Sequence, residues 1–551
     1  MRPSSAAWIC LLLRIANYTC YSYHVGRSDL YVGRAPRRMT KLSYENGKPH
    51  IDAGVVNYFK QIREEFPFFK RENCPAYFDS AATTQKPACV IGVSCPIAQL
   101  HRFVSPLCLT ASPHRFASPL RLTASPHRFA SPQKLTQFYS SENANVHRGI
   151  YKMSLDATRS YEQVRKTIKN FINCEREDEI IFTSGTTHGL NLICSMLMER
   201  VIKRRQDEIH LTYLEHHSNI VPWQEQVKRK KKGKIKYIPL KSTGYIHIKR
   251  LRKRINRNTK VVSISHVSNV LGNIQKLTAI IKAVKEKNKN AIVIVDAAQS
   301  FAHIRYDLRR MEANNCCPDV LIASGHKFCA PLGCGFMYLK NTLTCSYKFK
   351  PLLYGSNMIT TVGKYESEFE SPPQLFESGT QNIAGVISMG VAINFLERID
   401  QRLLCRYEMF LYDMLVYHLG QHLQRGLVQL PGGVSESGGS SGGSGGSRPT
   451  DPCRLYIHNS RRGGGKKVPI LPLWSDQFSS FDLVTFLDFK NVCIRSGHHC
   501  ASLLLKEFLR IPDCARVSLF FYNTPEEVQF LAEQIASIAR MLSGMNRGGV
   551  K

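Results

Sequence analysis

The sequence predicts an α/β protein with a buried, mostly parallel sheet, followed by a smaller α+β domain. Short apolar runs rich in β-branched residues alternate with stretches of helical character, and parallel strands covered by helices produce that alternation. Amphipathic patterns at 481–489 and 526–542 predict helices of the α+β domain. The clearest predicted strands are EIIFTS (179–184), KVVSISHV (260–267), AIVIVDAAQ (291–299) and DVLIASG (319–325).

Length and composition agree with this class. The chain has 551 residues, of which 43% are hydrophobic, and is long enough for two to four domains. Its 18 cysteines follow no short recurring spacing, which favours a reducing compartment over a disulfide scaffold. The formal charge of +33 gathers in basic segments such as 228–236 and 248–260. We interpret these segments as solvated loops and helix faces, and we expect no nucleic-acid partner.

Residues 1–50 have the composition of a targeting segment. The apolar run AAWICLLLRIA (6–16) resembles the central part of a signal peptide and is too short to span a bilayer. A basic, hydroxyl-rich stretch follows, in which Asp29 is the only acid, and it resembles a transit peptide. We therefore expect import into a plastid and no stable membrane insertion. The alternatives are a mitochondrial or cytosolic location, with an N-terminal extension that carries no address.

The remainder divides into three predicted parts. Residues 51–74 read as an amphipathic helix with a break at Pro67, expected to pack with the small domain. Residues 75–395 form the predicted large domain, and residues 396–551 form the predicted small domain.

Two low-complexity segments interrupt these domains. Residues 92–133 hold a tandem repeat with a 13-residue period, and residues 432–467 are rich in glycine and serine. Neither has strand or helix periodicity, so both are expected to loop out of the core. Joining Ile91 to Lys134 would give one continuous helix-like stretch. The repeat is therefore either a retained intron or a true insertion.

A lysine and an aspartate lie where open α/β sheets bind ligands, at the carboxyl ends of strands. They are Lys327 in SGHK and Asp296 in VIVDAAQ. Pyridoxal 5'-phosphate needs this pair, because the lysine forms a Schiff base and the aspartate keeps the pyridine nitrogen protonated. The stretch FTSGTTHGLNLI (182–193) reads as a strand, a glycine turn and a helix start, which can hold a phosphate.

Ten colinear stretches make the sequence resemble the SufS-type (group II) cysteine desulfurases of the class-V aminotransferase family, as a plastid- or apicoplast-targeted member. The resemblance implies a PLP-dependent transferase of fold type I, the aspartate-aminotransferase-like fold, and a homodimer. It covers nearly everything from residue 52 onward except the two inserted segments. Besides the motifs above, it rests on YFDSAATTQKP (77–87), NVHRGIYKMS (145–154), LEHHSNIVPWQ (214–224), SISHVSNVLG (263–272), FESGTQN (376–382), IRSGHHCA (494–501) and ARVSLFFYNTPEEV (515–528).

The resemblance also implies roles for single residues. Lys327, Cys500 and His216 are the implied catalytic residues, with His216 stacked on the cofactor ring. Arg516 is expected to bind the substrate carboxylate, with Asn269, His147 and Arg495 as further substrate contacts. The implied cofactor contacts are Lys327, Thr187, His216, Asn269, Asp296, Gln299, Ser324, His326, Gly355 and Thr380, of which Gly355 and Thr380 are expected to reach across a dimer interface.

The run CIRSGHHCASLLL (493–505) leaves three readings of Cys500 open when it is taken alone: zinc ligand, nucleophile or buried thiol. Adjacent His–His–Cys spacing suits one tetrahedral zinc site poorly, so we expect no metal. The resemblance implies that Cys500 is the persulfide carrier. Ser496 and the sequence CASLLL depart mildly from the family's usual residues.

The implied reaction removes sulfur from L-cysteine, giving L-alanine and a Cys500 persulfide for Fe–S cluster assembly. A SufE-like acceptor and a SufBCD-type scaffold are the implied partners. Selenocysteine lyase activity on the same scaffold is the enzymatic alternative. A non-catalytic basic binding or scaffold protein is the alternative of a different class.

Overall fold

The computed structural model describes residues 42–45, 47–91, 134–430, 453–458 and 465–548. The predicted signal run, the repeat at 92–133 and most of the glycine-serine segment lie outside these residues. The prediction that all of 432–467 loops out of the core is wrong, because Leu455–His458 form a sheet strand in which Leu455 and Ile457 are buried. Within the described part of the chain, no helix is long and apolar enough to cross a membrane.

The large domain is built on a seven-stranded sheet in the order β4-β10-β9-β8-β7-β5-β6. Strands β9, β8, β7, β5 and β6 run parallel, and β10 is antiparallel to both of its neighbours. The mostly parallel sheet predicted from the sequence is thus confirmed. The strands are β4 (Ile180–Thr183), β5 (Glu208–Thr212), β6 (Lys234–Ile238), β7 (Thr259–Ser265), β8 (Ile292–Asp296), β9 (Val320–Ser324) and β10 (Gly335–Leu339).

Both faces of this sheet are covered by helices, which explains why its strands are apolar throughout. In β8, Val293 and Val295 belong to one hydrophobic cluster, and Ile292 and Ile294 belong to another. Successive side chains therefore enter opposite layers. The helices of this domain are α6 (Lys152–Ile172), α7 (Thr186–Arg200), α8 (Val221–Lys230), α9 (Ile248–Arg254), α10 (Leu277–Lys287), α11 (Leu308–Ala313), α12 (Asn341–Tyr347) and α13 (Ile383–Glu397).

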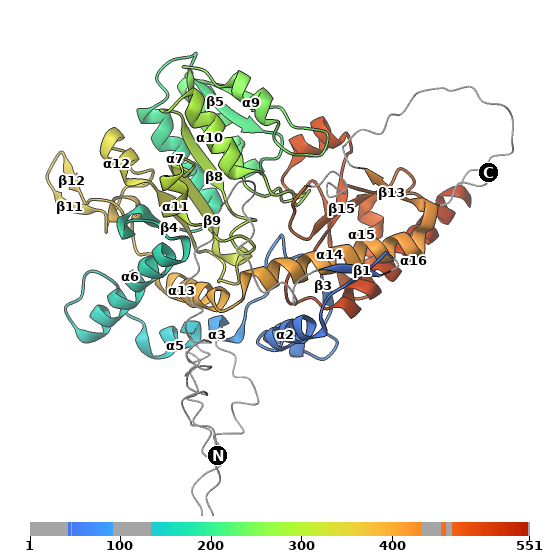
Figure 1. Cartoon of the computed structure of the whole chain (residues 1–551). Helices are drawn as coiled ribbons and strands as arrows, with labels where there is room; N and C mark the ends of the chain where they lie inside the picture. Colours follow the sequence, from blue (N-terminus) through green and yellow to red (C-terminus); the bar gives the residue numbers. More distant parts are fainter. Residues whose placement is uncertain (1–41, 46, 92–133, 431–452, 459–464, 549–551) are drawn as a thin grey trace, which may run out of the picture.

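The C-terminal domain has a five-stranded sheet in the order β13-β14-β15-β18-β17. Figure 1 shows that its first helix, α14, runs from beside α13 along the length of this domain. The strands are β13 (Leu427–Leu430), β14 (Leu455–His458), β15 (Ile470–Trp474), β17 (Arg495–Gly497) and β18 (Cys514–Ser518), and the helices are α14 (Gln401–Leu423), α15 (Ser480–Asp488) and α16 (Pro525–Gly548).

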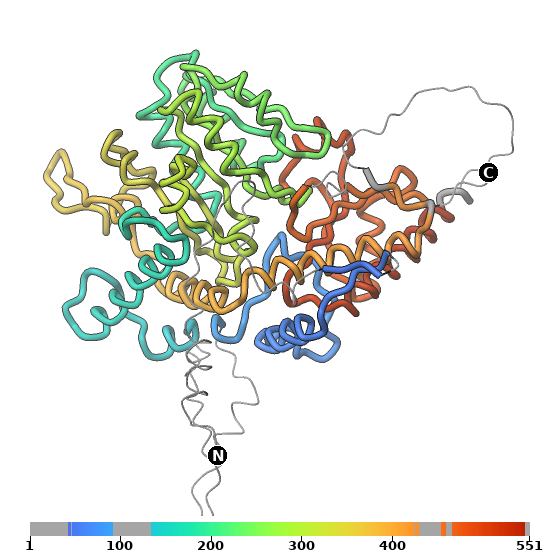
Figure 2. The backbone as a smooth tube through the Cα atoms, in the orientation of Figure 1, coloured from blue at the N-terminus to red at the C-terminus, as the bar shows by residue number. Residues whose placement is uncertain are grey.

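The N-terminal segment lies along this C-terminal domain (Figure 2). Helix α2 (Ala53–Arg63) is attached to α16 by the ion pairs Lys60–Glu526 at 2.9 Å and Arg63–Glu527 at 2.5 Å. A hairpin of β1 (Ser43–Glu45) and β2 (Lys48–His50), at the end of the predicted targeting segment, precedes it. After the short helix at Pro67–Lys70, β3 (Ala76–Tyr77) pairs with β16 (Val492–Cys493), and so carries the chain between the domains.

Two helical pieces lie on either side of the repeat, α3 (Ala88–Ile91) and α5 (Lys134–Gln137). The hydroxyl of Thr136 donates to the carbonyl oxygen of Ile91 at 3.1 Å. Within one helix, threonine makes this bond to the carbonyl three or four residues earlier. The geometry supports the view that the repeat interrupts a single helix, and its origin stays a prediction.

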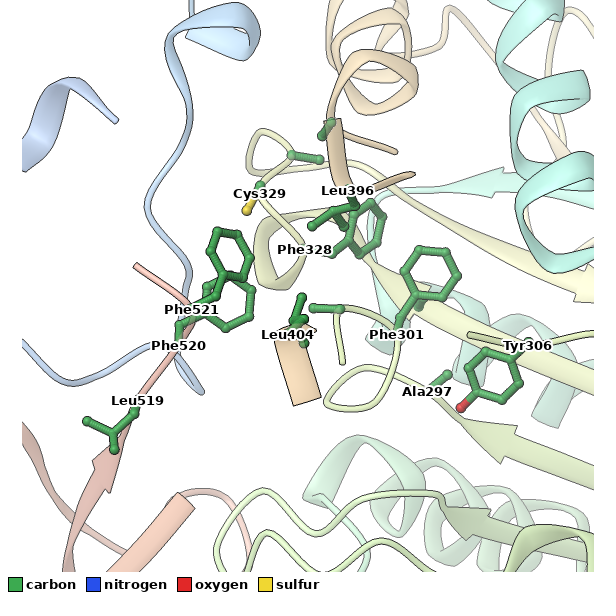
Figure 3. Packing of buried hydrophobic residues seen from close by; sticks show 14 of the residues in the cluster. Ala297, Phe301, Tyr306, Phe328, Cys329, Leu396, Leu404, Leu519, Phe520 and Phe521 are labelled. Carbon is green, nitrogen blue, oxygen red and sulfur yellow. The ribbon is translucent and has the colours of Figure 1, made fainter. Parts of the chain in front are cut away.

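An aromatic core anchors the backbone beside Lys327. Phe328 packs against Phe301 with 4.7 Å between ring centroids, and Phe301 packs against Phe336 at 5.1 Å. Figure 3 shows the same layer reaching Leu396 at the end of α13 and Leu404 on α14, the first helix of the C-terminal domain. Because Phe328 is fully buried, the turn before it has little freedom to move.

Candidate active site

A cavity of about 190 Å³ lies between the two domains, over the carboxyl ends of β7, β8 and β9. This is where an open α/β sheet binds its ligand. Its lining includes eleven of the fourteen residues predicted from the sequence, namely Thr187, His216, Asn269, Asp296, Gln299, Ser324, His326, Lys327, Arg495, Cys500 and Arg516.

Lys327 ends a short helical turn, Gly325–Lys327, that directly follows β9. Burial lowers the pKa of its ammonium to about 8, although the Asp296 carboxylate acts in the opposite direction. The preceding carbonyl, of His326, accepts from the hydroxyls of Thr83 and Thr84 at 3.1 Å and from the ammonium of Lys86 at 3.2 Å. The segment 83–86 therefore holds the turn that presents Lys327.

Asp296 closes β8 and is buried at the floor of the cavity. One of its carboxylate oxygens accepts from the amide of Ala298 at 2.9 Å. Burial raises the pKa of Asp296, and the Lys327 ammonium counters part of that rise. Gln299 lies close by and donates from its side chain to the carbonyl of Ala81 at 2.8 Å. Asp296 is thus placed to pair with a cation at the cavity floor.

The opposite end of the cavity suits a phosphate. Helix α7 begins there after Gly185, whose φ of +146° favours glycine. The amide of Thr186 donates to the Ser324 hydroxyl at 2.7 Å, and the Thr187 and Ser218 hydroxyls lie 2.7 Å apart. Among the described residues, the buried Nδ1 of His326 has no hydrogen-bond partner. Hydroxyls, a helix N-terminus and an unpartnered imidazole nitrogen together fit an anion.

His216 also lines this cavity. Its Nδ1 accepts from the amide of Ser218 at 3.1 Å, so the ring is oriented by its own turn. Burial, followed by the charge of Lys327, lowers the pKa of His216 to about 4. The ring is therefore neutral near pH 7, as stacking on an electron-poor pyridine ring requires.

Two guanidinium groups come from neighbouring strands. Arg495 on β17 is paired in register with Arg516 on β18, and both line the cavity. Arg516 is 2% exposed and donates to Asp79 Oδ1 at 2.7 Å and to the carbonyl of Asn269 at 3.1 Å. Two adjacent cations form a binding place for a carboxylate.

Cys500 lies on the turn after β17, in a backbone stretch with three positive φ angles. These are +109° at Gly497, +50° at His499 and +55° at Cys500. The side-chain amide of Asn269 donates to the carbonyl of His499 at 2.6 Å, and the amide of His217 donates to the carbonyl of Cys500 at 2.8 Å. The large domain therefore fixes the turn that points Cys500 into the cavity.

Three predicted residues lie outside this cavity within one chain. Thr380 lines a second cavity, together with Asn145, Arg148 and Asn357, and Gly355 is exposed beside Ser356 of that lining. His147 pairs with Glu162 at 3.0 Å. Sequence reasoning had placed Gly355 and Thr380 at a dimer interface and His147 in the substrate pocket. Among the described residues of a single chain, His147 is not part of the lining of the Lys327 cavity, and its backbone amide donates to the Thr158 hydroxyl at 2.9 Å.

Sequence reasoning missed Asp79, Lys86 and Glu215, although each stands inside a motif that it used. Glu215 accepts from the Thr212 and Ser265 hydroxyls at 2.5 and 2.7 Å, and burial raises its pKa to about 7. These three residues could have been found in the sequence as charged residues within motifs of mostly apolar or small residues. Charge alone did not reveal which partner each residue would meet across the fold.

Residues 129–430 and 460–531 match the family described as aminotransferase class-V. The chain belongs to this family. It is 45% identical over 562 residues to the cysteine desulfurase SufS of Plasmodium falciparum (isolate 3D7), covering 96% of this chain and 95% of the relative. It is 47% identical over 570 residues to PbSufS of Plasmodium berghei (strain Anka), covering 98% of both chains.

Solved structures of this aminotransferase class agree. A cysteine desulfurase from Thermococcus onnurineus NA1 superimposes with a TM-score of 0.68 at 26% identity, covering 87% of this chain and 98% of the other. Class-V aminotransferases use pyridoxal phosphate, and the cavity residues fit it: Asp296 for the pyridine nitrogen, Lys327 for the aldehyde and the α7 turn for the phosphate. The predicted family, fold and cofactor are confirmed.

Proposed function

We propose that this PLP-dependent cysteine desulfurase moves sulfur from L-cysteine onto Cys500, leaving a persulfide on the protein and releasing L-alanine. The observation that carries the proposal is a single cavity lined by Cys500, Lys327 and Arg516. A thiol, a buried amine and a carboxylate-binding cation are the three groups that this reaction needs from the protein.

Each of these side chains has a defined task. Arg516 and Arg495 bind the substrate carboxylate, which fixes the Cα of L-cysteine over the floor of the cavity. Bound pyridoxal phosphate supplies an electron sink for the pair at Cα. Lys327, with a pKa of about 8, is neutral in an appreciable fraction near pH 7 and takes the Cα proton.

Cys500 performs the sulfur transfer as a thiolate. Its sulfur attacks the substrate sulfur, so an S–S bond forms and the substrate Cβ–S bond breaks. The electron pair of the broken bond stays on Cβ, which is protonated, and Lys327 returns a proton to Cα to complete L-alanine. His216, neutral because its pKa is about 4, would lie against the reacting ring and orient it.

The direct test is mass spectrometry after one turnover without a reductant. Wild type should gain one sulfur atom on the peptide that contains Cys500 and release one equivalent of L-alanine. Cys493→Ser, which changes a thiol on the adjacent strand outside the cavity lining, serves as the matched control and should behave as wild type. Full sulfur transfer by Cys500→Ser, or a persulfide on another cysteine, would contradict the proposal.

We also propose a homodimer in which the second cavity meets the partner's Lys327 cavity. Support comes from Thr380 in the lining of the second cavity, from the exposed Gly355 and from large apolar side chains that are exposed in the large domain. Ile150 is 96% exposed, Tyr365 is 90% exposed and Leu332 is 71% exposed. A contiguous apolar surface marks an interaction site, and the proposed dimer would cover these side chains. Sedimentation should give twice the chain mass.

The persulfide needs an acceptor, and we propose a SufE-like protein that passes sulfur to a SufBCD-type scaffold for Fe–S cluster assembly. Support comes from the group II motifs alone.

The proposed location is a plastid such as the apicoplast, reached through residues 1–50. A fluorescent protein fused to residues 1–50 should enter that organelle, and a cytosolic signal would contradict the location.

Selenocysteine lyase activity is the alternative to cysteine desulfurase activity. Comparing alanine release from cysteine and from selenocysteine decides between the two activities.

A further inference from the structure

His217 makes three hydrogen bonds to the turn that carries Cys500. Its backbone amide donates to the carbonyl of Cys500 at 2.8 Å. Its ring Nε2 accepts from the backbone amide of Ser502 at 3.1 Å and lies 3.1 Å from the Ser502 hydroxyl. One residue of the large domain therefore holds the backbone on both sides of Ala501, immediately after the reactive thiol.

These bonds define the state of the imidazole. A backbone amide can only donate, so Nε2 must carry a lone pair and the ring proton must be on Nδ1. The Ser502 hydroxyl can then donate to the same nitrogen. Burial, with a smaller contribution from His498, lowers the pKa of His217 and favours this neutral form.

An apolar contact accompanies the hydrogen bonds. Leu214 and Val270 of the large domain pack with Ala501 and Leu504 in one buried cluster. Leu504 begins the helical turn Leu504–Leu509 that follows Cys500. This cluster places the helix after the thiol, but it acts beyond Cys500 and leaves the orientation of the Cys500 carbonyl to polar groups.

His217 does not line the Lys327 cavity, whereas its neighbours His216 and Ser218 do. Its carbonyl accepts from the amide of Ile220 at 3.0 Å, whereas its ring Nε2 and its own amide bind the turn that carries Cys500. We propose that His217 is a positioning residue for the sulfur transfer, acting through Ser502 and the Cys500 carbonyl to hold the thiol toward Lys327. This inference rests on the proposed role of Cys500 as the sulfur carrier.

The test needs a readout that does not depend on turnover. We would measure the rate at which iodoacetamide alkylates Cys500 in the holoenzyme, by mass spectrometry of the peptide that contains it. In His217→Leu the turn loses its acceptor, and alkylation should rise roughly tenfold, the factor expected from one or two ordinary hydrogen bonds. For the same variant, kcat should fall while the KM for L-cysteine stays near wild type, because Arg516 is untouched.

A conservative variant of His217 distinguishes a hydrogen-bonding role of this side chain from a role in packing alone. In His217→Gln the side-chain oxygen can accept from Ser502 near the position of Nε2, so alkylation rate and kcat should return toward wild type. His498→Gln is the matched control, since His498 is an exposed histidine of the same turn. Ser502→Ala removes only the hydroxyl and should give a partial rise, which Ser502→Thr should not.

The outcomes are distinct. Wild-type alkylation and kcat in His217→Leu would overturn the inference, and so would a His217→Gln variant as impaired as His217→Leu. Should His217→Leu not fold, as judged by the absorbance of the bound cofactor, the Ser502 pair decides: equal alkylation of Ser502→Ala and Ser502→Thr overturns it. The proposed role of Cys500 fails separately, when the wild-type peptide gains no sulfur in a single turnover.

Discussion

Arg516 and Asp79 form an ion pair at the edge of the substrate cavity, with 2.7 Å between Nη2 and Oδ1. Arg516 is almost fully buried, whereas the Asp79 side chain is 21% exposed. The pair joins β18 of the C-terminal domain to the strand connection after β3. The ion pair keeps the guanidinium of Arg516 oriented before substrate binds. The substrate carboxylate then binds a guanidinium that is already paired with Asp79.

Arg516→Lys should therefore weaken substrate binding more than it weakens cofactor binding. Lysine keeps the charge but cannot make parallel hydrogen bonds to a carboxylate and to Asp79. The expected change is a roughly 10- to 100-fold rise in the KM for L-cysteine, as for the loss of a charged hydrogen bond. The bound-cofactor absorbance should be kept. A KM equal to wild type would remove Arg516 from substrate binding.

A second ion pair lies behind the phosphate turn and concerns stability. Arg165 donates from Nη1 and Nη2 to the two carboxylate oxygens of Glu377, both at 2.7 Å, and the pair is almost completely buried. Glu377 Oε1 also accepts from the amide of Phe182 in β4 at 2.7 Å. The carboxylate therefore connects α6, the FESGTQN motif and the first strand of the sheet.

Arg165→Met should lower the free energy of unfolding by about 3–5 kcal/mol, since it leaves a buried carboxylate without its partner. Urea unfolding measures this. The matched control is Arg159→Met on the same helix, where the pair with Asp156 is solvent-exposed and the expected change is close to zero. Equal stabilities of the two variants would show that the buried pair contributes nothing specific.

Strand and motif positions were predictable because they depend on local patterns. The apolar runs at 260–267 and 291–299 contain most of β7 and all of β8, although β7 begins at Thr259 and the two strands end earlier, at Ser265 and Asp296. Lys327 and Asp296 were found because the carboxyl ends of parallel strands meet at one edge of a sheet. Eleven of the predicted site residues consequently line one cavity.

Partnerships across the fold were not predictable from those patterns. Asp79 meets Arg516 from 437 positions away, and His217 meets Ser502 from 285 positions away. Such pairs depend on how the two domains are placed, which no local periodicity encodes. The antiparallel strand β10 was missed for a similar reason, because its run GFMYL directly follows the lysine motif and is only five residues long.

Glu215 predicts a pH dependence of stability. Burial, with a contribution from the Asp296 charge, raises its pKa to about 7 from an ordinary value near 4.3. Between these values the folded state binds more protons than the unfolded state, so this group's contribution to stability falls as pH rises. The ionised Glu215 side chain therefore destabilises the folded state fully above about pH 7, and this destabilisation is absent well below about pH 4.

Glu215→Gln should remove this dependence. Between pH 4 and pH 8, the unfolding free energy of the variant should rise by about 3 kcal/mol relative to that of wild type. A rise of the Glu215 pKa from its ordinary value to about 7 implies this amount. Urea unfolding across that range measures it. Glu286→Gln on α10 changes an exposed carboxylate and is the control. A difference that does not vary with pH would contradict the assigned shift.

The proposed dimer makes a prediction that a monomeric site cannot meet. Lys327→Ala removes the Schiff-base amine, and Thr380→Ala removes a proposed phosphate contact to the partner's cofactor. When the two variants are co-expressed, each mixed dimer contains one site with an intact Lys327 from one chain and an intact Thr380 from the other. The opposite site lacks both groups. Random pairing makes half of the dimers mixed, so activity should reach about a quarter of wild type.

The control is each variant expressed alone. Lys327→Ala dimers should be inactive, and Thr380→Ala dimers should retain less cofactor after gel filtration. If Thr380 instead served the cavity of its own chain, no combination of these two chains would contain a complete site. Activity would then stay at half of the Thr380→Ala value in the mixture. Restoration above that level requires the partner's Thr380 to reach the site, because mixing changes nothing else in either cavity.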